Sequence, residues 1–277
     1  MSVLALSPFD LAIAATLVLA LAALSLRLQL GVERQLLFSA ARSTLQLLLI
    51  GVVLKVLFEN AQLLWVALMA GVMIMLAGRE VMVRQKRRLV GGWGFGVGTL
   101  SIFVSSFAIT VLALLVVIGS DPWYAPQYAI PLLGMILGNT MNGIALGLDR
   151  LTQDAAQKRQ IIETRLALGQ NWKQAISDCR REAIRVGMIP IINAMSAAGV
   201  ISLPGMMTGQ ILAGTPPVEA VKYQILVMFL IAGGTGFGTV VAVSLAARRL
   251  FDERQRLRLD RLALDQGRHL HLEVARR

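Results

Sequence analysis

A small number of polar side chains interrupt the apolar stretches of this sequence, and they are the residues best placed to contact a solute that crosses a membrane. The candidates are Asn139, Asn142, Asn193 and Ser196 within these stretches, together with Met206, Met207 and Gln210 in the segment that follows them. In each of the first two pairs the residues are three positions apart, so on a helix they share one face. Such a face can line a substrate pathway, and it can equally hydrogen-bond to a neighbouring helix.

The methionines raise the question of a metal. The thioethers of Met206 and Met207 suit copper(I) better than the harder ferrous ion, while methionine also fills irregular gaps in packing. Within the apolar stretches no Asp or Glu lies beyond the ends, and Asp10 is at the outer edge of the first. Carriers coupled to protons or ions commonly use carboxylates within the membrane, so this distribution argues against them. The metal ligands stay unknown, and we predict no catalytic residue and no enzyme activity in this chain.

Helices in lipid must position these side chains. Apolar residues make up 56% of the chain and charged residues only 16%, too few charges to cover a soluble domain. Seven stretches are apolar enough to cross a hydrocarbon core of about 30 Å. They are residues 9–26, 44–58, 63–78, 97–118, 129–148, 186–203 and 224–247. Lipid offers no partner to a free backbone group, so we predict an all-α polytopic membrane protein.

The basic residues predict the orientation. Of 27 Lys and Arg residues, all but Lys55 and Lys222 fall on one side of the seven-span arrangement. By the positive-inside rule that side is cytoplasmic, which puts the C-terminus inside and the N-terminus outside the cell inner membrane. Residues 1–9 contain no Lys or Arg, unlike a cleavable signal peptide, so we expect the first apolar stretch to be retained. The same clustering argues against nucleic acid as a partner, despite a net charge of +11.

Two segments of the predicted transmembrane domain, residues 1–247, are not explained by spanning. Residues 149–185 form a long cytoplasmic connection. Residues 204–223 are too polar for a span and too apolar for a free loop, and we predict an outer gate or re-entrant element there. A basic cytoplasmic tail, 248–277, follows. For this tail we predict a solvated helix, with anionic lipid or a partner ATPase as alternative contacts.

The cytoplasmic connection carries signals for helix ends. Residues 163–168 predict a short helix that ends at Gly169, a residue able to adopt the left-handed conformation of a helix C-terminus. Asn171 can cap the next helix, and Gln174 three residues later completes a capping-box spacing. A helix-turn-helix joined rigidly to a span is a lever, because force on the short helix moves the span.

The residues of this connection resemble a known sequence pattern. Glu163, Ala167 and Gly169, followed by an amphipathic stretch and Ile189-Pro190, resemble the EAA-type coupling segment of ABC transporter permeases. Thr164 and Arg165 stand where that segment has two alanines. A more specific resemblance is to the FetB (YbbM) family of iron-export ABC transporter permeases. It rests on RLALG (165–169), REA (181–183), IP (189–190), SLPGMMTGQILAG (202–214), YQI (223–225) and RSTLQLLLIGVVLKVLF (42–58).

The resemblance implies an ATP-driven permease whose coupling helix seats in a cytoplasmic ABC ATPase subunit. The coupling residues would be Glu163, Arg165, Leu166, Ala167 and Gly169. The sequence contains no G-x-x-x-x-G-K-[ST] string, so we expect no cofactor on this chain and ATP and Mg on the partner. One chain offers one coupling segment, and two ATPases usually act together, so we expect a homodimer in membrane lipid. Iron export is implied by the resemblance alone. An ion-coupled secondary transporter and a non-transporting scaffold subunit remain alternatives.

Overall fold

The protein is almost entirely helical, as predicted from its composition. The computed structural model describes residues 7–59 and 61–264, so residues 1–6 of the expected N-terminal stretch and residues 265–277 of the predicted tail lie outside the described residues. Long helices are α1 (Pro8–Arg27), α2 (Glu33–Glu59), α3 (Leu63–Val83), α6 (Pro126–Gln157), α9 (Ser177–Ala197) and α11 (Pro217–Arg249). Three shorter helices are α7 (Arg159–Ala167), α8 (Trp172–Ala175) and α10 (Gly205–Leu212).

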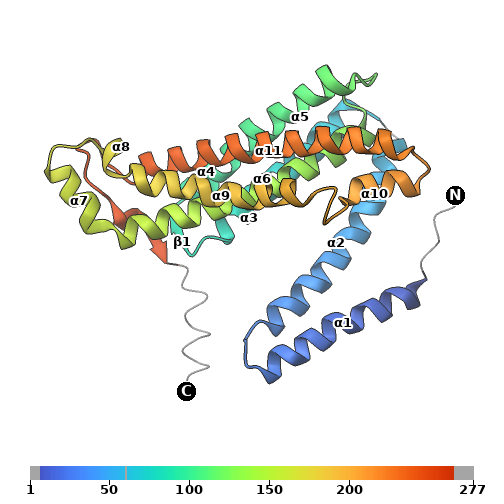
Figure 1. The fold of residues 1–277 in the computed structure, drawn as a ribbon, viewed down its shortest axis with the longest axis horizontal. Coiled ribbons are helices and arrows are strands. Elements are labelled where there is room, and N and C mark those ends of the chain that lie inside the picture. Colours follow the sequence, from blue (N-terminus) through green and yellow to red (C-terminus); the bar gives the residue numbers. More distant parts are fainter. Residues whose placement is uncertain (1–6, 60, 265–277) are drawn as a thin grey trace.

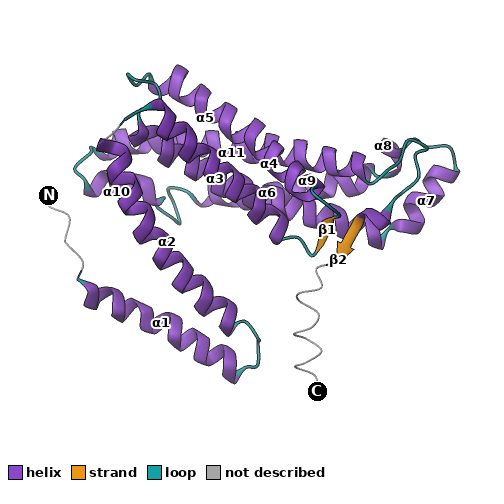
Figure 2. Ribbon diagram, turned by 180° about the vertical axis from the view of Figure 1, so that it is seen from behind, coloured by secondary structure: helices purple, strands orange, loops and turns teal. Residues whose placement is uncertain are grey.

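One further rod mixes two kinds of helix. It consists of α4 (Trp93–Ile102), the π-helical η1 (Phe103–Phe107), α5 (Ala108–Leu112) and the π-helical η2 (Ala113–Ile118). Two short strands, β1 (Arg87–Leu89) and β2 (Leu262–Leu264), pair antiparallel, and the 3-10 turn η3 (Leu259–Arg261) precedes β2. Figure 2 shows the strand pair as the only sheet drawn, beside a body of helices.

Six of the described helices are long and apolar enough to cross a membrane, and they coincide with six of the seven predicted stretches. The stretch 186–203 is the one that differs. There α9 begins earlier, at Ser177 in polar sequence, and ends at Ala197, before a turn in which Gly199 has a φ of +82°. Charged residues in the first half of α9 lower its hydropathy. The seven-span count and the orientation of the termini therefore stay predictions.

The centre of the molecule is a group of three helices, α6, α9 and α11, that lie along one another (Figure 1). Helices α3 and α4 pack against each other and against α6. At one end of this body lie α7 and α8, and at the other lies α10 (Figure 1). We call the first of these the α7 end.

The backbones of the three central helices approach closely at two glycines. A Cβ on Gly143 would lie 2.5 Å from Thr235 Cγ2 and 2.8 Å from the carbonyl oxygen of Gly187, and a Cβ on Gly187 would lie 2.6 Å from the carbonyl oxygen of Gly143. These distances leave no room for a side chain, and neither neighbouring carbonyl can swing aside. Glycine is thus required where α6, α9 and α11 meet, as in other helix pairs built on small residues.

Helices α1 and α2 form a hairpin that stands away from the body (Figures 1 and 2). The two helices pack on each other, and α2 contacts α6 over a short length. None of the residues of the apolar window of α2 is buried. The hairpin therefore presents most of its surface to lipid or to another protein.

After α11 the chain does not continue as the predicted solvated helix. Residues 250–264, which we call the C-terminal strap, turn back along the α7 end and finish as β2 on the loop between α3 and α4. The turn is made by Asp252 to Gln255, where Gln255 takes a φ of +59° and its N–H donates to the carbonyl oxygen of Asp252 at 3.0 Å. The described part of the tail is therefore an ordered segment packed on the protein.

Candidate functional site

The short helix α7 has the ends that the sequence predicts. Its C-terminus is closed by Gly169 at a φ of +87°, with Gly169 N–H donating to Leu166 O at 3.0 Å and Gln170 N–H to Arg165 O at 3.1 Å. This is the Schellman arrangement. Asn171 Oδ1 accepts from Gln174 N–H at 3.0 Å, and Gln174 Oε1 accepts from Asn171 N–H at 3.1 Å. The predicted capping box is thus confirmed, and α7 starts at Arg159, four residues before the predicted start.

The five predicted coupling residues divide between two faces of α7. Glu163, Ala167 and Gly169 are exposed, whereas Arg165 and Leu166 are half-buried. Leu166 packs against the core, and Ile162, one turn earlier, is only 1% exposed. One face therefore anchors the helix, and the other is open to a partner.

Arg165 fixes α7 to the helix that follows. Its guanidinium donates to Asp178 Oδ2 at 2.7 Å and to the carbonyl oxygen of Ala175 at 3.4 Å. The Arg165 guanidinium beside Asp178 holds the pKa of that carboxyl below its usual range. Arg165 stands where the EAA-type segment has alanine, and its role here is to join α7 to α8 and α9.

The most exposed apolar side chain on this turn belongs to Leu168, which is not among the predicted coupling residues. Leu168 is 78% exposed and lies between α7 and Gly169. Within the RLALG string its apolar character gave a signal, because a solvated turn favours polar residues.

An open groove of about 960 Å³ runs between α7 and the C-terminal strap. Glu163, Ala167 and Gly169 line one side, and Glu253, Arg254 and Arg256 are among the residues that line the other. The exposed coupling residues therefore face a groove rather than a flat surface.

The predicted pathway residues on α6 and α9 are exposed on the bundle. Asn139 Nδ2 donates to the carbonyl oxygen of Met135 at 2.8 Å, and Ser196 Oγ donates to that of Ile192 at 2.9 Å, so each side chain bonds within its own helix. Asn193 is exposed as well. Among the described residues, no hydrogen bond joins one pair to the other. A polar face open at membrane depth requires water or a second protein surface.

Asn142 belongs to a chain of polar contacts across three helices. Arg42 of α2 donates to Glu80 Oε1 of α3 at 2.8 Å, and Arg84 Nε lies 3.9 Å from Glu80 Oε2. Arg84 also donates to Asn142 Oδ1 of α6. Glu80 was not selected from the sequence because the predicted third span stopped at 78, whereas α3 continues to Val83. Two arginines around one carboxylate make this an ion-pair cluster and leave no room for a cation.

The outer segment forms the short helix α10. Met206, Met207 and Gln210 lie on it and are partly buried, and Met206 packs against the hydrophobic core. The buried Gln210 Oε1 has no hydrogen-bond partner among the described residues. The gate function predicted for 204–223 stays a prediction.

Metal ligands do not gather anywhere in the described part of the chain. No group of three His, Cys, Asp or Glu residues lies close enough there to hold an ion. Cys179, the single cysteine, is buried, and its burial raises the pKa of the thiol. A transported metal would have to be bound by oxygen and sulfur atoms that are not part of such a cluster.

Comparison with known proteins decides the family. The model of a family described as "Uncharacterised protein family (UPF0014)" matches residues 8–251. This chain belongs to the UPF0014 family. It is similar to the UPF0014 membrane protein slr1647 of Synechocystis, with 41% identity over 232 residues that cover 82% of this chain and 87% of the relative.

Two further relatives of this UPF0014 member carry names that describe a role. It is 34% identical over 254 residues to the "Probable iron export permease protein FetB" of Escherichia coli, covering 90% of this chain and 93% of the relative. It is 32% identical over 246 residues to "Protein ALUMINUM SENSITIVE 3" of Arabidopsis thaliana, covering 88% of each. The resemblance stated from the motifs is thereby confirmed, and this UPF0014 protein is a multi-pass membrane permease. No solved structure matches the chain.

Proposed function

We propose that this UPF0014 permease is the membrane-spanning subunit of an ATP-driven ABC transporter of the inner membrane, with ATP and Mg bound by a separate cytoplasmic ATPase. The observation that carries the proposal is α7, a helix closed by hydrogen bonds at its C-terminus, anchored on one face and open on the other. Ordered helices that expose their coupling face are suited to receive force. Glu163, Ala167 and Gly169 are the proposed contact residues, and Arg165 and Leu166 position them.

Helix α7 is connected directly to the long helices of the protein. Only Lys158 separates it from α6, and Arg165 ties it to α9 through Asp178. Because α6 and α9 meet at Gly143 and Gly187 without intervening side chains, displacement of α7 moves both helices together. This is the movement that would switch the pathway from inward to outward access.

The substrate pathway in this proposal runs between two copies of the chain. Asn139, Asn142, Asn193 and Ser196 are exposed in one copy, and a second copy would enclose them away from lipid. Met206, Met207 and Gln210 would lie at the outer mouth. Export of a metal ion, iron in the first instance, is supported by the name of the Escherichia coli relative.

The ATPase is tested by purifying the tagged permease from native membranes and labelling the eluate with azido-ATP. We expect one labelled polypeptide with the wild type and its loss with Glu163→Arg and with Gly169→Pro, since proline cannot adopt a φ of +87°. Gly214→Pro is the matched control. Gly214, after α10, has a φ of +100° and closes its helix with the same pair of bonds, Gly214 N–H to Ile211 O and Thr215 N–H to Gln210 O, both 3.0 Å. Absence of a labelled partner in the wild type would favour an ion-coupled carrier or a scaffold.

The substrate is tested by the metal content of cells that lack the permease. We expect iron to accumulate after an iron load, and expression of the wild type to restore the normal content. Unchanged iron with a changed content of another metal would replace iron in the proposal. The Met206→Leu/Met207→Leu variant keeps the bulk of both side chains, and we expect it to lose transport while its ATPase binding persists.

A further inference from the structure

We propose that the C-terminal strap is the second wall of the ATPase docking site, so that the partner contacts strap residues 253–256 as well as α7. This inference rests on the proposed function and adds to it a contact surface outside the coupling segment. The acceptor would be a groove with two walls rather than a single helix.

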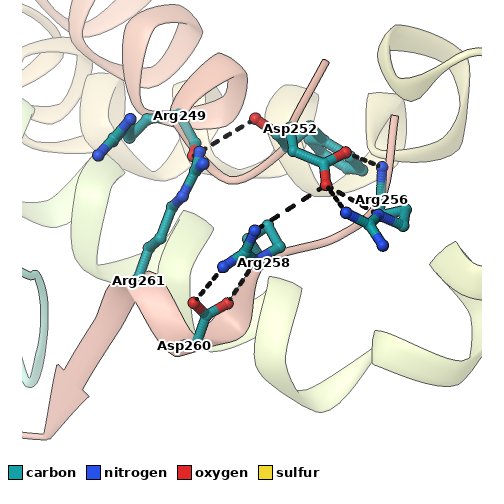
Figure 3. Close-up of polar contacts among 7 residues, drawn as sticks. Arg249, Asp252, Arg256, Arg258, Asp260 and Arg261 are labelled. Atoms are coloured by element: carbon teal, nitrogen blue, oxygen red, sulfur yellow. Dashed lines mark hydrogen bonds and ion pairs between the residues drawn. The ribbon is translucent and has the colours of Figure 1, made fainter. Parts of the chain in front are cut away.

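The strap is held in place by its own polar contacts (Figure 3). The Arg261 guanidinium donates to Arg249 O at 2.7 Å and to Phe251 O at 3.1 Å, which satisfies carbonyls at the end of α11. Arg258 pairs with both oxygens of Asp260 at 2.8 Å, and Arg256 Nε donates to Asp252 at 2.8 Å. A wall fixed in this way is organised before a partner arrives, which lowers the entropic cost of binding.

The strap is also bound to the helices that follow α7. The side-chain oxygen of Gln255 accepts from Trp172 N–H at 3.0 Å, so the strap supplies a cap for the first turn of α8. The ring centroids of Trp172 and Phe251 lie 5.7 Å apart. The strap is therefore joined to α8, which follows α7 closely in the chain.

The position of the groove favours a protein over lipid. A helix of 32 residues such as α6 is about 48 Å long, whereas the hydrocarbon core is about 30 Å thick. The charged residues of α6, such as Asp149 and Asp154, lie at the α7 end, so this is the end that projects beyond the hydrocarbon. Leu168 is 78% exposed there, which leaves its side chain available for a protein contact.

The charge of this end indicates the chemistry of the partner. Residues 158–185 and 251–264 together carry eleven basic and six acidic side chains. Among the described residues, no ion pair is formed by Glu253 or Arg254, which are exposed on the strap side of the groove. An ATPase that fits here presents a predominantly acidic face with an apolar depression for Leu168.

Site-specific cross-linking tests the second wall. Cys179 is 3% exposed, so an introduced surface cysteine is the thiol that a photoactivatable reagent reaches. The variants are Leu168→Cys on the α7 side, Arg254→Cys on the strap side and Lys222→Cys as a control at the far end of α11. Each is irradiated in native membranes, and the products are probed for azido-ATP labelling.

We expect Leu168→Cys and Arg254→Cys to trap the same azido-ATP-labelled polypeptide and Lys222→Cys to trap none. Trapping from position 168 but not 254 would overturn the inference and leave the proposed function standing. Trapping from neither would remove the proposed function as well. Equal trapping from Lys222→Cys would also overturn the inference, because the partner would then not be confined to the groove. Independently, Arg254→Glu should lower the retained ATPase several-fold, whereas retention at the wild-type level would overturn the second wall.

Discussion

The α7 end and the α1–α2 hairpin are built in opposite ways. At the α7 end, segments from three parts of the sequence hold one another through backbone pairing, an arginine that satisfies helix-terminal carbonyls, and a glutamine that caps a neighbouring helix. The hairpin is long, yet among the described residues it is joined to the body mainly by a short stretch against α6, by Leu57 in the apolar core and by the ion pair between Arg42 and Glu80. Polar side chains such as Ser43 and Gln46 are exposed on α2. The first region is complete within one chain, and the second requires surroundings that the chain alone does not supply.

The largest expected effect comes from adding a side chain to the body and to the hairpin. Gly143→Leu places atoms into the backbone of α9, and we expect a loss of stability of about 1–3 kcal/mol or failure to fold, as in overpacked cores. Gly51→Leu is the matched change in α2, where no atom lies within 4 Å of an added Cβ. Thermal unfolding in detergent compares them. Equal losses from both variants would contradict a loosely attached hairpin.

Release of the strap should have the next largest effect. Arg261→Ala removes a charged donor from two carbonyls, which we expect to cost about 1.5–3 kcal/mol of local stability. Hydrogen exchange should quicken at Val90, whose N–H donates to Arg261 O at 2.8 Å, and at residues 250–264. Arg254→Ala, on the same segment, should leave exchange unchanged. Slow exchange in Arg261→Ala would mean that apolar packing alone holds the strap.

The ion pair between the hairpin and α3 should contribute less. Arg42 and Glu80 are 46% and 28% exposed, so we expect Arg42→Glu to cost about 0.2–1 kcal/mol. The measurement is the rate of proteolysis in the 28–32 linker, which should rise as α2 leaves the body. The exchanged pair, Arg42→Glu with Glu80→Arg, should restore the wild-type rate. Failure of the exchange would indicate that Arg84, which also donates to Asn142, binds Glu80 more strongly than Arg42 does.

The smallest expected effect is a pH dependence at the α7 end. The pKa of Asp178 is lowered by Arg165, so its contribution to stability is present above the ordinary value of 3.8 and is lost as pH falls through the lowered one. The protection factors of α7 amides, which are corrected for the intrinsic pH dependence of hydrogen exchange, should be constant between pH 7 and about 5 and should fall only in strong acid. Arg165→Gln should exchange faster already at neutral pH. The hairpin, which lacks this pair, serves as the internal reference.

The sequence predicted those features whose signals are local. Gly169, Asn171 and Gln174 act through neighbours a few residues away, and each has the role assigned to it. Apolar runs likewise located the six described helices that are long and apolar enough to cross a membrane, because that property belongs to one continuous stretch. The predicted stretch 186–203 extends further than α9, which ends at Ala197 because the chain turns at Gly199.

Features that depend on distant residues could not be predicted from the same signals. The strap looks like a charged solvated tail because its arginines pair with nearby acids, and its Gln255 to Trp172 bond joins positions 83 residues apart. Asn142 was selected as a polar residue in an apolar stretch, but its partner Arg84 comes from another helix. The spacing of residues in the sequence predicts which of them share a helix face, whereas tertiary contacts decide what that face packs against.

The close contact between Gly143 and Gly187 has a geometrical consequence for α6. Gly143 lies near the middle of a helix that extends from Pro126 to Gln157, so the closest backbone contact of the rod is at its centre, and side chains such as Ile130 and Leu151 pack nearer its two tips. Any tilt about that fulcrum carries the tips in opposite directions. An inward push where α6 meets α7 would appear at the far tip as an outward swing, which converts one stroke into closing at one face and opening at the other.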